Sequence, residues 1–82
     1  MRAVTLYGRP GCHLCDEALA TIEALRGELS PFELRQVDIE TDEALLRAYL
    51  ERIPVVEVDG EIVSELALDR AALRSALAPV SA

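Results

Sequence analysis

The sequence predicts one α/β domain with a four-stranded mixed sheet, built as βαβ followed by ββα and flanked by helices on both faces. Three observations lead to this prediction. The chain of 82 residues is 51% hydrophobic, which suits one folded unit over residues 1–82. Runs of β-prone residues alternate with segments whose apolar positions recur at helical spacing. An Asp-Gly pair between two of the β-prone runs indicates an antiparallel hairpin.

The first half of the chain is expected to form a strand, a helix and a second strand parallel to the first. Residues 2–7 (RAVTLY) are β-prone and end at residues 8–11 (GRPG), which continue neither a strand nor a helix. A helix should run from about Cys12 to Gly27, followed by a strand over residues 32–39 near a sheet edge, because that strand is charged. The apolar positions of the helix are Leu14, Ala18, Ile22, Leu25 and Leu29.

A second helix is expected to begin at Thr41. Asp42 and Glu43 then lie in its first turn, where acidic side chains complement the helix dipole. The helix should end before Pro54, because proline cannot continue it. Its apolar stripe comprises Leu45, Leu46, Tyr49 and Leu50.

The last part of the chain predicts a hairpin and a third helix. Residues 54–58 and 61–63 form the hairpin strands, because Asp59-Gly60 supplies the positive φ angles of a two-residue type I′ turn. Asp69 can cap the last helix, which should end near Pro79. The apolar face of this helix is Ala72, Leu73, Ala76 and Leu77.

Composition and charge argue against several function classes. The chain has 15 acidic residues against eight arginines and no lysine, a formal net charge of -7, so nucleic acid is not an expected partner. No apolar run approaches the roughly 20 residues that span a bilayer, and the first ten residues are too short in apolar content for a signal-peptide core. We therefore expect a cytoplasmic protein with no membrane contact.

Cys12 and Cys15 are the candidate catalytic residues. Three positions apart at a helix start, they share one face, with Cα atoms about 5.5 Å apart, so a disulfide can form between them. The helix start favours the thiolate of Cys12 and lowers its pKa below the free value of about 8.5, and it acts less on Cys15. Cys12 is thus the expected nucleophile and Cys15 the resolving thiol. Arg9 and protonated His13 would add to this effect if they reach the sulfur.

Two other functions stay open at this point. A zinc site needs four ligands, and the chain offers only His13 beyond its two cysteines, so an intramolecular site is not expected. A metal ion or iron–sulfur cluster shared between two chains remains an alternative. A non-catalytic interaction module on the same fold is another.

Several motifs resemble the glutaredoxin-like proteins of the thioredoxin superfamily. They are residues 6–15 (LYGRPGCHLC), then Ile53-Pro54-Val55, then Val58-Asp59-Gly60. The order βαβ-ββα is also the one that this family uses. The resemblance implies a thioredoxin/glutaredoxin-like fold, a redox pair at Cys12 and Cys15, and a cis-proline at Pro54 beside that pair. It also implies that the backbone of Ile53 pairs with an extended substrate.

From this resemblance we expect a thiol-disulfide oxidoreductase that acts on protein or small-molecule disulfides, with Arg9, His13, Ile53 and Pro54 binding substrate. No cofactor or metal is expected to be bound, and a monomer is expected. Glutathione is a candidate co-substrate, and glutathione or a thioredoxin-type reductase is the expected reductant. Glutaredoxins typically have a Gly-Gly pair where this chain has Ser64-Glu65, so bulk and negative charge at Glu65 should disfavour glutathione, with Arg52 offsetting part of that charge.

Overall fold

A central four-stranded sheet and its flanking helices follow the predicted order, βαβ then ββα. The structure is a computed structural model and describes residues 2–78. The strands are β1 (Arg2–Gly8), β2 (Phe32–Asp38), β3 (Val55–Val58) and β4 (Glu61–Ser64). The helices are α1 (His13–Leu25), α2 (Glu43–Tyr49) and α3 (Arg70–Ala76), with short 3-10 turns η1 (Arg26–Glu28) and η2 (Ile39–Thr41).

Strand β1 lies inside the sheet, whose order is β2-β1-β3-β4. It runs parallel to β2, with Arg2 opposite Phe32, and antiparallel to β3. Strand β3 returns as β4 through Asp59 and Gly60, whose φ angles are 51° and 89°. These left-handed angles are the ones that a type I′ turn requires, so the predicted hairpin is confirmed. Strand β2 is at the edge of the sheet, as its charges predicted.

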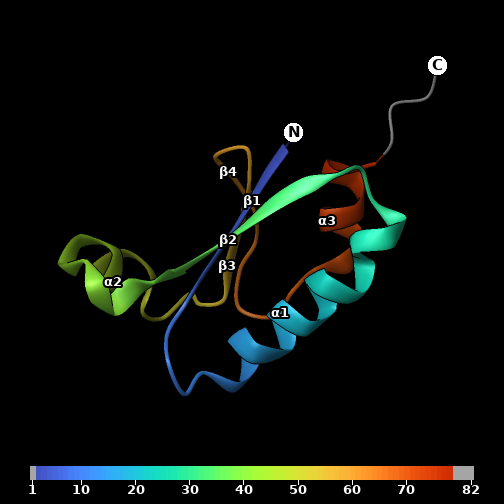
Figure 1. The fold of residues 1–82 in the computed structure, drawn as a ribbon. Helices are drawn as coiled ribbons and strands as arrows, with labels where there is room; N and C mark the ends of the chain where they lie inside the picture. Colours follow the sequence, from blue (N-terminus) through green and yellow to red (C-terminus); the bar gives the residue numbers. More distant parts are fainter. Residues whose placement is uncertain (1, 79–82) are drawn as a thin grey trace.

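Helices cover both faces of the sheet: α1 and α3 lie on one side and α2 lies on the other (Figure 1). The main core fills the space between the sheet and the α1–α3 layer, where burial of apolar surface holds α1 against the strands. Its buried members are Val4, Leu6, Ala18, Ile22, Leu25, Phe32, Val56, Val58, Leu73 and Leu77.

Two tyrosines connect α2 to the opposite face of the sheet. The ring centroids of Tyr7 and Tyr49 are 5.0 Å apart in a tilted arrangement. The Tyr7 hydroxyl donates a hydrogen bond to Glu57 Oε2 at 3.2 Å. Burial, and after it the Glu57 carboxylate, raises the pKa of the Tyr7 hydroxyl, so the hydroxyl stays protonated and remains a donor.

Helix α1 is shorter than predicted. Cys12 is its N-cap rather than part of the helix, and the chain tightens into η1 after Leu25. The buried face of α1 is Cys15, Ala18, Ile22 and Leu25. The expectation that Leu14 belongs to this face is wrong, because its side chain is 47% exposed. The first turn of α1 projects past the end of the strands, at the bottom of Figure 1, which leaves Leu14 facing solvent.

Helix α2 also differs from its prediction. Asp42, not Thr41, is the N-cap: its carboxylate accepts hydrogen bonds from the backbone N–H groups of Ala44 and Leu45 at 2.8 and 3.3 Å. The Thr41 hydroxyl instead donates to a backbone carbonyl in the preceding turn. None of the seven residues of α2 is fully buried, and Leu50 beside it is 43% exposed. The predicted apolar stripe is therefore only partly covered.

Ser64 and Asp69 define the start of α3. The Asp69 carboxylate accepts from the backbone N–H of Ala72 at 3.0 Å, which confirms the predicted cap. The hydroxyl of Ser64, a buried residue, accepts from the Asp69 N–H at 2.8 Å and donates to a carbonyl of the β4–α3 loop. Helix α3 ends at Ala76, and the predicted end near Pro79 lies outside the described residues.

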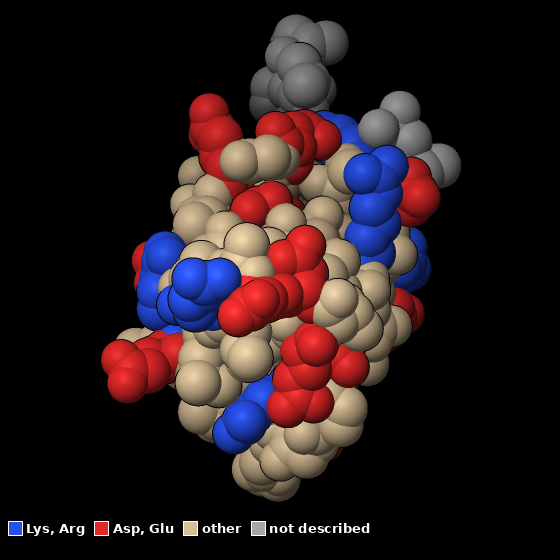
Figure 2. Space-filling model, turned by 90° about the vertical axis from the view of Figure 1, so that its left-hand side faces the viewer, with Lys and Arg blue, Asp and Glu red and all other residues tan. Residues whose placement is uncertain are grey.

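Charged side chains cover much of the face that carries α2, where acidic groups are spread widely and arginines lie beside some of them (Figure 2). Two of the shortest ion pairs are Arg52–Glu65 at 2.6 Å and Arg2–Asp59 at 2.7 Å. Within residues 2–78, none of the helices has the length and apolar character needed to cross a bilayer.

Candidate active site

Cys12 and Cys15 form a disulfide at the start of α1, with their Cα atoms 5.2 Å apart. Cys12 is half-buried, and its Sγ accepts a hydrogen bond from the Cys15 backbone N–H at 3.1 Å. Cys15 is only 6% exposed. A partner molecule therefore reaches Cys12 more readily than Cys15. The roles of nucleophile and resolving thiol stay a prediction.

Gly8, the last residue of β1, lets the strand approach the disulfide closely. A Cβ atom added at Gly8 would lie 3.0 Å from both Cβ and Sγ of Cys15. This distance is tighter than ordinary van der Waals contact, so a side chain at this position would push against the disulfide. The sequence signalled Gly8 only as a strand terminator; no pattern in the chain shows that it faces Cys15.

The Ile53-Pro54 peptide bond is cis, as the resemblance implied, and Pro54 is fully buried. The contact expected between Pro54 and the cysteine pair stays a prediction. The backbone N–H of Ile53 donates to the Tyr49 carbonyl at 3.0 Å, because the chain leaving α2 continues as a tight turn. A substrate strand that pairs with Ile53 would have to replace this bond or use the Ile53 carbonyl alone.

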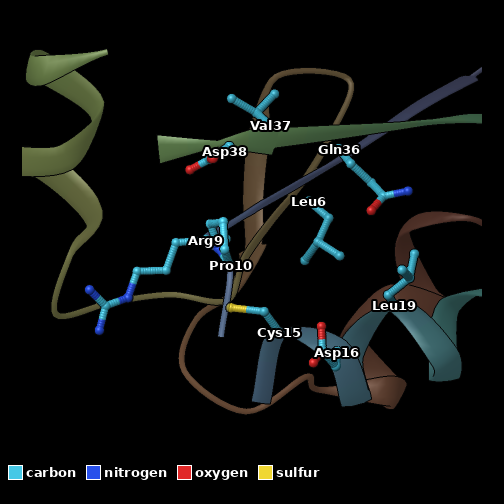
Figure 3. A pocket seen from close by; sticks show the side chains of 10 residues that line it. Leu6, Arg9, Pro10, Cys15, Asp16, Leu19, Gln36, Val37 and Asp38 are labelled. Atoms are coloured by element: carbon cyan, nitrogen blue, oxygen red, sulfur yellow. The ribbon is translucent and has the colours of Figure 1, made fainter. Parts of the chain in front are cut away.

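Arg9 precedes the two cysteines in sequence and His13 lies between them, but each forms an ion pair with another side chain. Arg9 Nη1 lies 3.9 Å from Glu40 Oε2, and Figure 3 shows its side chain extending away from Cys15. His13 Nε2 lies 3.3 Å from Glu17 Oε1, and the His13 side chain is 85% exposed. In this structure the Arg9 guanidinium is thus directed at Glu40 rather than at the sulfur. A role of these two residues in substrate binding stays a prediction.

Arg52 and Leu66 lie beside Glu65, which with Ser64 occupies the place where glutaredoxins typically carry a Gly-Gly pair. Arg52 Nε donates to Glu65 Oε1, and the Leu66 N–H donates to the Arg52 carbonyl at 2.9 Å. The hydrogen bond that the Arg52 side chain donates to Glu65 lowers the pKa of the Glu65 carboxyl. Leu66 has a φ of 65°, a left-handed conformation that glycine adopts most easily, and its side chain is 55% exposed. The Glu65 side chain, paired with Arg52, occupies space that a Gly-Gly pair would leave open.

A pocket of about 290 Å³ adjoins the disulfide on the side of β1 that faces β2 (Figure 3). We call it the β2-side pocket; Leu6 and Leu19 give it apolar walls. Cys15 and Arg9 contribute to it as well, and so do three further polar residues. Those three are Asp16 from α1 and Gln36 and Asp38 from β2. They come together only because β2 lies beside β1, which no local pattern shows.

Metal-ligating side chains do not cluster near the disulfide. Across residues 2–78, the structure contains no group of three or more His, Cys, Asp or Glu residues placed to hold a metal ion. His13, the third candidate ligand in the sequence, is instead turned to Glu17.

Comparison with known proteins assigns the chain to a family. The profile of the glutaredoxin-like domain (DUF836) matches residues 3–78. The chain belongs to the glutaredoxin-like domain family. The match includes all but the first residue of β1, together with the disulfide, the cis-proline and the hairpin. This family and the spacing of Cys12 and Cys15 suggest a thiol redox function for the glutaredoxin-like chain.

Solved structures share its thioredoxin-like fold. The solution structure of protein Ne2328 from Nitrosomonas europaea is similar with a TM-score of 0.83 and 34% identity, over 94% of this chain and 92% of that chain. A mutant thioredoxin from Halobacterium salinarum is similar with a TM-score of 0.62 and 25% identity, over 98% of this chain and 78% of that chain.

A curated relative matches over a shorter segment. A glutaredoxin from Haemophilus influenzae is 44% identical over 39 residues, which are 48% of this chain and 45% of the relative. The match thus spans about half of each protein. Substrates and partners of the glutaredoxin-like chain are therefore matters for proposal.

Proposed function

We propose that this glutaredoxin-like protein is a thiol-disulfide oxidoreductase with Cys12 as its nucleophile and Cys15 as its resolving thiol. The observation that carries the proposal is the disulfide between a half-buried helix N-cap and a buried cysteine one turn later. In the reduced protein, the Cys15 N–H and the start of α1 favour a negative charge on the Cys12 sulfur. The less accessible Cys15 acts second.

The proposed reaction transfers two electrons from the cysteine pair to a substrate disulfide. The Cys12 thiolate attacks one substrate sulfur, forms a mixed disulfide and releases the other substrate sulfur as a thiolate. The Cys15 thiolate then attacks the Cys12 Sγ, which closes the Cys12–Cys15 disulfide and releases the second substrate thiolate. The structure corresponds to this oxidised product. Two thiols of an external reductant, glutathione or the dithiol of a thioredoxin-type reductase, regenerate the pair.

We further propose that the substrate is a disulfide-containing protein or small molecule, and that no resident cofactor takes part. Glutathione then acts as a co-substrate at most. A reducing compartment such as the cytoplasm supplies the thiols that this cycle consumes. Carboxylates on Glu65 and elsewhere favour partners that are not strongly acidic.

A preference for protein disulfides over glutathione mixed disulfides follows from the surface around Glu65. Glutathione is anionic and needs a close approach to backbone, which glycine permits and the side chain of Glu65 hinders. The Arg52–Glu65 ion pair adds a second obstacle, because a glutathione carboxylate that used Arg52 would have to displace Glu65. The chain should therefore reduce a protein disulfide faster than a glutathione mixed disulfide.

Cysteine substitutions test the catalytic roles. Cys12→Ser should abolish reduction of a protein disulfide, because the attacking sulfur is lost. Cys15→Ser should accumulate a mixed disulfide on Cys12, visible as a mass increase of one substrate thiol. Retained turnover in Cys12→Ser would overturn the proposal.

Equilibration in glutathione redox buffers tests the role of glutathione. The wild type should give mainly the intramolecular disulfide, with little glutathione adduct. Glu65→Gln should raise the rate of reduction of a glutathione mixed disulfide, because it removes a negative charge and weakens the bond that holds Arg52. Glu61→Gln in the hairpin removes the same charge elsewhere and serves as the control. Fast glutathione-specific turnover by the wild type would contradict the predicted preference.

A further inference from the structure

The β2-side pocket is separate from the Ile53-Pro54 segment. Because β1 lies between β2 and β3, the pocket and the cis-proline flank the active-site end of β1 from opposite sides. Cys15 contributes to the pocket wall, so a group bound there lies next to the disulfide (Figure 3). A substrate held on Cys12 could therefore place one of its own side chains in this pocket.

The walls of the pocket combine apolar and acidic surface. Leu6 and Leu19 provide an apolar surface, and Leu6 is buried. Asp16 lies on α1 and Asp38 lies at the end of β2, so carboxylates come from two elements (Figure 3). One Asp38 oxygen accepts the Glu40 N–H at 2.9 Å. The Arg9 side chain extends out of the pocket toward Glu40, so its cation is already paired with a carboxylate outside it.

We infer that the β2-side pocket binds a lysine or arginine side chain of the disulfide substrate; this inference rests on the proposed function. Such side chains have an aliphatic stem that packs on apolar walls and a cationic end that carboxylates bind. A volume of about 290 Å³ is at the lower end of ligand pockets, so it suits one side chain rather than a large ligand. The net charge of -7 also attracts basic partners during encounter.

Peptide disulfides that differ at one position provide the test. Each peptide carries Lys, Gln or Glu beside its cysteine, and kcat/KM is measured for the wild type, Asp16→Asn and Asp38→Asn. The ratio of kcat/KM for the Lys peptide to that for the Glu peptide should exceed one in the wild type. Each substitution should lower this ratio about two- to fivefold, as expected for partly exposed ion pairs. Because intrinsic reactivity of each peptide is the same for every variant, it cancels in the comparison.

Charge placement is controlled with Glu61→Gln, which removes a carboxylate in the hairpin and should leave the ratio unchanged. A wild-type ratio near one would overturn the inference. So would a ratio that Asp16→Asn and Asp38→Asn do not change, or one that Glu61→Gln lowers equally, since the last result would indicate net charge rather than the pocket. If the Gln peptide is reduced in each of these cases, the proposed function itself stands.

A second measurement needs no turnover and separates the two proposals. The Cys15→Ser protein is equilibrated with equal amounts of the Lys and Glu peptides in a thiol–disulfide buffer, and the two mixed disulfides on Cys12 are quantified by mass. The Lys adduct should exceed the Glu adduct about two- to fivefold. Introducing Asp16→Asn into the Cys15→Ser variant should reduce this excess. Equal adducts would overturn the inference even if no peptide were turned over, whereas absent turnover alone would overturn only the proposed function.

Discussion

One glycine sets how closely β1 and the disulfide can approach each other. The Cβ that any other residue would carry at position 8 falls 3.0 Å from two atoms of Cys15. Cys15 cannot retreat freely, because it is buried and bonded to Cys12. Gly8 therefore supports the redox pair without taking part in its chemistry.

Replacing Gly8 by alanine should destabilise the oxidised protein by about 1–3 kcal/mol, the usual cost of forcing an extra methyl group into a packed site. Urea unfolding of the oxidised proteins measures this loss. Gly27→Ala is the matched control, because a Cβ at Gly27 meets no atom within 4 Å and the same residue type is introduced. Equal stability of the two variants would show that the approach of Gly8 to Cys15 is not tight in solution.

At the scale of elements, the chemical nature of the N-caps separates α1 from the other helices. Asp42 and Asp69 cap α2 and α3 with carboxylate oxygens, whereas the cap of α1 is the sulfur of Cys12. Sulfur is a weaker acceptor than a carboxylate when neutral, and it becomes a charged one as a thiolate. The start of α1 is thus coupled to the redox and charge state of Cys12, while the starts of α2 and α3 are not.

The cap of α3 provides a test at this scale. Asp69→Ala should lower the free energy of unfolding by about 0.5–2 kcal/mol, because the Ala72 N–H loses its acceptor. Asp69→Asn retains an oxygen acceptor and should lose clearly less. Chemical denaturation of both variants measures the difference, and equal losses would mean that the charge of Asp69, not its hydrogen bond, stabilises α3.

For the whole molecule, the core between the sheet and the α1–α3 layer should dominate stability. Leu73 is fully buried in this core, so Leu73→Ala should cost about 2–5 kcal/mol through lost burial and a cavity. Leu50→Ala is the control, because Leu50 is 43% exposed and should cost far less. Unfolding midpoints measure both, and a small loss at Leu73 would mean that the core repacks around the cavity.

Stability should also fall at acidic pH. Hydrogen bonds from the Ala3 N–H and then Arg2 lower the pKa of Asp59 from 3.8, and Arg52 lowers that of Glu65 from 4.5. Both carboxyls therefore bind fewer protons in the folded than in the unfolded protein. Their contribution is present above these values and is lost as the pH falls from about 4.5 through the lowered folded-state pKa values.

Denaturation of the wild type at pH 6 and pH 3 measures this effect, and the double variant Asp59→Asn/Glu65→Gln should lose less stability between the two pH values. Glu61→Gln removes a carboxylate that forms no ion pair or side-chain hydrogen bond within residues 2–78, and this variant should behave as the wild type. An unchanged pH dependence in the double variant would show that other carboxyls control acid unfolding.

Local patterns in the sequence determined the order of elements, the hairpin turn and the chemical pair at Cys12 and Cys15. These features depend on residues close together in the chain, such as Asp59-Gly60, whose side chains and backbone preferences act over a few positions. The cis bond at Pro54 came from the family resemblance, not from a local rule.

Tertiary structure alone decided which side chains meet around that pair. Leu14 lies at helical spacing from the buried residues of α1, yet it is exposed because the first turn projects past the strands. Arg9 turns to Glu40, and Gly8 lies against Cys15, through contacts between elements that the strand order brings together. The β2-side pocket has the same origin, since Asp16 and Asp38 are 22 positions apart in the chain and share a surface only because β2 pairs with β1.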